Sequence, residues 1–71
     1  MTTIDILKNL ARIDQMLSLR DEARRAGDPE SLLVVKMMDH AVAGTRQSLR
    51  RGVSQARYAE LGRQHPILCG C

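Results

Sequence analysis

The sequence predicts an all-α protein: an antiparallel helical hairpin that is completed by dimerisation or by a partner chain. Apolar residues recur every three or four positions along two long stretches, which is the spacing of one helical face. The sequence Gly-Asp-Pro at 27–29 separates the two stretches. Tyr58 is the single aromatic residue, so the core must be aliphatic, which suits helix packing better than a β-sheet.

The first helix is expected over residues 3–26. Thr2 and Asp5 have the spacing of a capping box, with aspartate in place of the usual glutamate. An apolar face follows, formed by Ile6, Leu7, Leu10, Ile13 and Leu17. After Leu17 the pattern becomes polar, so the last two turns are expected to face solvent or a partner rather than a core. Gly27 then provides a C-cap.

The second helix is expected over residues 29–62, with Asp28 as its N-cap and Pro29 at the first helical position. Its apolar stripe consists of Val35, Met38, Val42, Thr45, Leu49, Val53 and Ala56. Near Gly52 the sequence is equally consistent with a continuous helix and with a kink or break. Residues 1–63 thus form the hairpin. Pro66 excludes helix through 64–65, and residues 64–71 are expected to be a short flexible tail.

The inner seam of the hairpin is predicted to pair the two apolar faces, with Ile6, Leu10, Ile13 and Leu17 against Val42, Thr45, Leu49 and Val53. Leu33 and Met37 point away from this seam, and two helices alone cannot cover them. The partner-binding residues are therefore predicted to be Leu33, Val35, Met37, Met38, Val42 and Leu49. The expected partner is another protein chain or a second copy, which would give a four-helix arrangement.

Charge is unevenly distributed between the two halves of the chain. Residues 1–35 contain five Lys/Arg and six Asp/Glu, whereas residues 36–71 contain six and two. A solvated basic helix end explains this pattern, and the helix dipole favours it. The alternative is a small DNA-binding or transcription-regulating protein that uses the basic second half of the helix. Residues 52–56, with Tyr58 and Leu61, resemble the turn and recognition helix of helix-turn-helix proteins. The candidate phosphate contacts are Arg46, Arg50, Arg51 and Arg57.

The sequence indicates no enzyme, no cofactor and no metal site. It shows no Ser/His/Asp set, no Gly-rich phosphate-binding loop and no helix with two histidines at metal-binding spacing. His65, Cys69 and Cys71 offer three potential zinc ligands, one fewer than a structural zinc site needs. No apolar run approaches membrane-spanning length, and no export signal is recognisable at the N-terminus. We therefore expect a cytoplasmic protein.

Two segments carry a resemblance to a known family: Met1-Thr2-Thr3-Ile4-Asp5-Ile6-Leu7 and Arg25-Ala26-Gly27-Asp28-Pro29-Glu30. They resemble the small E-type co-chaperones of bacterial type III secretion needle subunits, over about residues 1–55. The needle subunits themselves also look similar, with Asp-Pro at the hinge of a hairpin. The resemblance implies a bacterial, non-enzymatic protein. Such a protein would bind a helical-repeat co-chaperone that clamps the needle subunit and helps to keep that subunit soluble.

Overall fold

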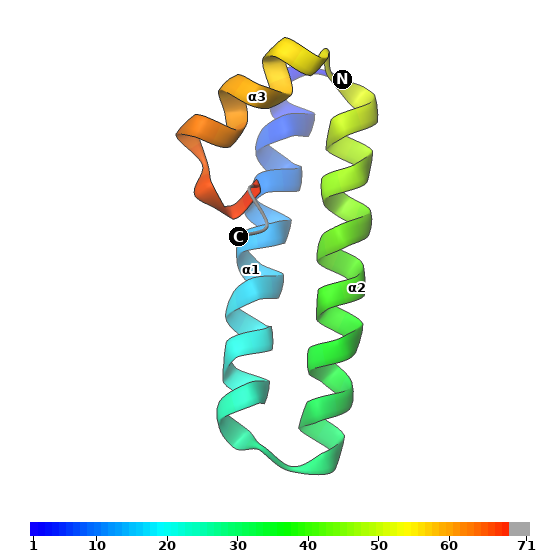
Figure 1. Cartoon of the computed structure of the whole chain (residues 1–71), viewed down its shortest axis with the longest axis vertical. Helices are drawn as coiled ribbons and strands as arrows, with labels where there is room; N and C mark the ends of the chain where they lie inside the picture. Colours follow the sequence, from blue (N-terminus) through cyan, green and yellow to red (C-terminus); the bar gives the residue numbers. More distant parts are fainter. Residues whose placement is uncertain (69–71) are drawn as a thin grey trace.

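A computed structural model describes residues 1–68 and contains three α-helices and one short 3₁₀ helix. The elements are α1 (Thr3–Ala26), α2 (Pro29–Gly52), α3 (Gln55–Gln64) and η1 (Pro66–Leu68). Figure 1 shows α1 and α2 side by side and antiparallel, with α3 turning back across the end of the pair and η1 lying against α1. The all-α hairpin predicted from the sequence is confirmed.

The hinge between α1 and α2 forms as the capping residues predict. The Gly27 backbone has a φ of 72°, in the left-handed region, and its N–H donates to the Ala23 carbonyl at 3.3 Å. Only glycine reaches this region at little cost, which explains its position after the helix. The Asp28 side chain accepts a hydrogen bond from the Ser31 N–H at 3.3 Å, and Pro29 begins α2. The connection is short because the C-cap of α1, Gly27, is followed directly by the N-cap of α2, Asp28.

Of the two alternatives near Gly52, the structure has the break: the helix expected over 29–62 is divided, because α2 ends at Gly52 and α3 starts at Gln55. Ser54 caps the new helix, with its hydroxyl accepting a hydrogen bond from the Arg57 N–H at 3.2 Å. The Met1 side chain packs where a Cβ at Gly52 would stand, with its Cε 2.6 Å from that position. Ala56 was assigned to the stripe of the second helix but is exposed, because the break changes the direction of the chain.

The segment expected to be a flexible tail packs against the rest of the chain as far as it is described. Gln64 is the last residue of α3, one residue beyond the limit that Pro66 was expected to set. Leu68 is only 5% exposed and belongs to the core, and the Ile67 carbonyl accepts a hydrogen bond from Arg46 Nε at 2.9 Å. The apolar side chains of η1 therefore have a place to pack. The remainder of the predicted tail, with Cys69 and Cys71, lies outside the described residues.

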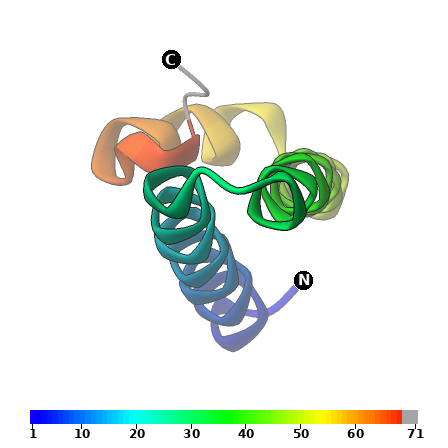
Figure 2. The same ribbon diagram turned by 90° about the horizontal axis from the view of Figure 1, so that it is seen from below.

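The core lies in the half of the hairpin that carries the chain's first residues. Its buried members come from every element: Ile6, Leu10, Ile13, Val42, Leu49, Leu61 and Leu68. Viewed from below, α3 and η1 cover one side of the α1–α2 pair (Figure 2). The predicted seam is confirmed at its centre, where Ile13 and Leu49 are fully buried. Two helices and a folded-back third segment thus supply a small three-sided core.

Candidate functional site

The hinge half of the hairpin, residues 18–40, has no fully buried residue. It also holds five of the eight large apolar side chains that are exposed within residues 1–68. We call these five the hinge-half surface: Leu19, Leu32, Leu33, Val34 and Met37, which are 40–64% exposed. Natural cores bury such residues, and a concentration of exposed ones marks a candidate interaction surface.

The structure separates the six predicted partner-binding residues into three groups. Leu33 and Met37 are 61% and 64% exposed, so both are available to a partner. Val35 and Met38 are half-buried along the inner side of α2. Val42 and Leu49 are 2% and 0% exposed inside the core. The prediction that they bind a partner is therefore not supported, because they cannot form part of an open surface. Sequence periodicity placed all six on one helix but could not show which ones the chain itself covers.

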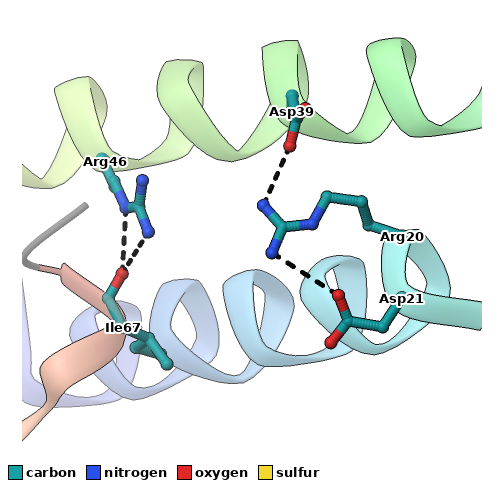
Figure 3. A network of polar contacts seen from close by, with 5 residues as sticks. All are labelled: Arg20, Asp21, Asp39, Arg46 and Ile67. Carbon is teal, nitrogen blue, oxygen red and sulfur yellow. Dashed lines mark hydrogen bonds and ion pairs between the residues drawn. The ribbon is translucent and has the colours of Figure 1, made fainter. Parts of the chain in front are cut away.

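The apolar seam ends at Arg20, which occupies the next position on the inner face of α1 after Leu17. Its Nη1 donates to Asp39 Oδ1 of α2 at 2.9 Å, and Nη2 lies 3.5 Å from Asp21 Oδ1 (Figure 3). The hydrogen bond with Asp39 raises the pKa of the Arg20 guanidinium, which stays charged. A partly exposed pair of this kind contributes at most about 1 kcal/mol. Arg20 therefore joins the helices without extending the core.

The second candidate site is basic and lies where α2 is followed by α3. Of the four predicted arginines, Arg46 is taken up by its bonds to the Ile67 carbonyl (Figure 3). Arg50, Arg51 and Arg57 are exposed. The Arg50 guanidinium lies over the Tyr58 ring, 5.2 Å from its centroid, and Arg57 Nη1 is 3.4 Å from Glu60 Oε2. Three of the four are thus open to solvent near the break between α2 and α3.

A pocket of about 480 Å³ opens at this basic surface. Its lining consists of Arg50, Gln55, Tyr58 and Ala59. Sequence reasoning used Gln55 and Tyr58 only as part of the helix-turn-helix motif, and it did not use Ala59. The signal that could have found the pocket is Ser54, a good N-cap that places all three residues at the start of a new helix.

Within residues 1–68 no three His, Cys, Asp or Glu side chains come together as a possible metal site. Of the three potential zinc ligands, His65 is partly buried, and Cys69 and Cys71 lie outside the described residues. None of the helices described in 1–68 combines the length and hydropathy needed to cross a membrane. Comparison of the chain with protein-family models, with curated proteins and with solved structures found no match.

Proposed function

We propose that the protein is a non-enzymatic protein-binding module, and that its hinge-half surface holds a helix of another chain. The main observation in support of this proposal is the contrast between the two ends of the hairpin. The core end buries seven apolar residues and exposes three large ones, whereas the hinge end buries none and exposes five beside a polar seam. Covering apolar area of this kind stabilises by about 25 cal/mol per Å².

The outer face of α2 is the part of this surface best shaped to receive a helix. Leu33 and Met37 are four residues apart and share a face, and Leu33 lies two and a half turns from the buried Val42, on the opposite side of α2. Gly44 continues the same face, and a Cβ placed there would meet nothing within 4 Å. A partner helix can therefore approach α2 closely along Leu33, Met37 and Gly44.

The charges around this surface favour recognition through apolar contact. Residues 18–40 contain four Lys/Arg and five Asp/Glu, a net charge of −1. Such a near-neutral surface provides little long-range attraction, so binding should change little with salt. The co-chaperones that the first 55 residues resemble bind helical proteins, which agrees with this type of partner.

Site-specific photo-crosslinking tests the proposal. A photoreactive residue at position 33 or 37 should form an adduct with one other protein in an extract of the source cells. The same residue at Lys8, an exposed position on α1 beside the core half, is the control and should form none. Unlabelled wild type should compete the adduct away, while the Leu33→Asp, Met37→Asp double variant should not. Equal adducts from all positions, or none from 33 and 37, would refute it.

A second candidate is a small DNA-binding regulator. The observation in its favour is the break after Gly52, which leaves two helices joined by a short turn with Ser54 capping the second, as in helix-turn-helix proteins. If Arg50, Arg51 and Arg57 contact phosphates of a duplex, log Kd should change with log salt with a slope of about 2.7. The absence of salt-dependent duplex binding would exclude this candidate.

A further inference from the structure

The pocket between α2 and α3 joins an aromatic ring to a guanidinium that pairs with no carboxylate of residues 1–68. Among residues 1–68 the ion pairs involve Arg20 and Arg57, and Arg50 takes part in none of them. Its guanidinium lies over the Tyr58 ring, 5.2 Å from the centroid. Stacking on a ring orders the planar guanidinium while leaving its N–H donors free. Arg50 is therefore positioned in advance for an anion.

The surroundings of the pocket are positively charged. Between residues 40 and 68 the chain contains five arginines and a single acidic residue, Glu60, which is paired with Arg57. Arg51 and Arg57 are exposed and lie next to pocket-lining residues in the sequence, one beside Arg50 at the end of α2 and one beside Tyr58 in the first turn of α3. Several spaced arginines suit a ligand that carries several phosphates rather than one.

Tyr58 is half-buried, with part of its side chain against the core cluster, and it is the chain's one aromatic residue. A ring held in this way is a rigid platform for stacking. The pocket volume of about 480 Å³ lies in the range of small-ligand sites and can receive one nucleotide unit. The Gln55 amide lines the same pocket and can both donate to and accept from the edge of a base.

We propose that this pocket binds single-stranded nucleic acid. One base stacks on the Tyr58–Arg50 pair, and neighbouring phosphates contact Arg51 and Arg57. Within a duplex the base faces are covered by their neighbours, so they cannot reach Tyr58, whereas an unpaired base can. The proposal uses a different surface from the hinge half and does not depend on the partner helix proposed there.

Fluorescence anisotropy with a labelled 12-mer oligothymidylate tests this proposal. Binding is expected at low salt, with log Kd changing with log salt with a slope of about 1.4, since Arg51 and Arg57 each displace about 0.7 counterions from a single strand. Tyr58→Ala should weaken binding by roughly 5- to 150-fold through lost stacking. Tyr58→Phe keeps the ring and should bind as wild type does. Arg50→Lys keeps the charge but loses the planar stack, and should also weaken binding.

Arg25→Gln is the matched control, because it removes one exposed positive charge in the hinge half, far along the chain from the pocket. If Arg25→Gln and Arg50→Gln weaken binding equally, net charge alone attracts the strand and the pocket assignment fails. Three further results would overturn it: no binding of the 12-mer at low salt, equal binding of a duplex of the same length, or equal affinity for thymidine monophosphate. Because Arg50 is exposed, its variants test the pocket even if Tyr58→Ala fails to fold.

Discussion

Two leucines on opposite sides of α2 provide a matched test of where this protein keeps its core. Leu49 is 0% exposed, and Leu33 on the same helix is 61% exposed. Replacing a buried leucine with alanine costs about 2–5 kcal/mol, from the lost transfer energy and the cavity left behind. A domain of this length has a total stability of roughly 4–10 kcal/mol, so Leu49→Ala should remove a large share of it.

Leu33→Ala should cost far less. The folded chain covers only about two fifths of this side chain, which corresponds to roughly 0.8 kcal/mol out of the roughly 2 kcal/mol for full burial of a leucine. The higher helix propensity of alanine returns about 0.2 kcal/mol, so the net loss should be about 0.6 kcal/mol. Urea unfolding followed by circular dichroism at low micromolar concentration measures both variants. Equal losses would show that Leu33 is buried in the isolated protein and would refute the assignment of the open face.

Four further predictions address the hinge, the outer face and self-association. Pro29→Gly should lower the free energy of unfolding by about 1 kcal/mol, since it loosens the unfolded chain and the first turn of α2; an unchanged melting temperature would argue against the hinge. Gly44→Ala should stabilise by up to about 1 kcal/mol, because its Cβ meets nothing within 4 Å, and thermal melting would show a loss instead if the site were crowded. Hydrogen bonds from the Ser31 side chain and N–H lower the pKa of Asp28 below 3.8. The resulting stability is present above the ordinary aspartate pKa and is lost as pH falls through the lowered pKa of the folded state, so Asp28→Asn should reduce the fall in melting temperature on acidification below pH 3.8. Without its partner the wild type should sediment as a dimer or larger at roughly tens of micromolar, whereas Met37→Asp should keep its helicity and favour the monomer; a wild-type monomer at that concentration would weaken the proposed surface.

The hairpin could be predicted from the sequence because its determinants are local. Thr2, Asp5, Gly27 and Asp28 each act on backbone groups within four residues, and the structure shows every one of these caps. Helical spacing likewise placed Ile13 on the inner face. Information of this kind needs no knowledge of what the rest of the chain does.

The start of the third helix and the contacts that it makes could not be decided from the sequence, because they depend on packing between residues that are far apart in the chain. Gly52 permitted both a break and a continuous helix; in the structure Met1 approaches it closely from the other end of the chain. Leu68 is buried because η1 returns to α1, which no local pattern in 64–68 indicates. The pocket with Arg50 and Tyr58 lies where the chain breaks between α2 and α3. Placing residues on the faces of one continuous helix could not reveal it.

The central claim is that the hinge half has no core of its own and therefore offers its apolar side chains to another chain. Native-state amide hydrogen exchange, read residue by residue in the dilute free protein, tests this most directly. Amides of residues 42–49 and 10–13 should exchange only by global unfolding. Helical amides of residues 20–25 and 33–38 should open locally at a free energy several kcal/mol lower. Equal protection along both helices would contradict the account, because it would require the hinge half to be as well packed as the core.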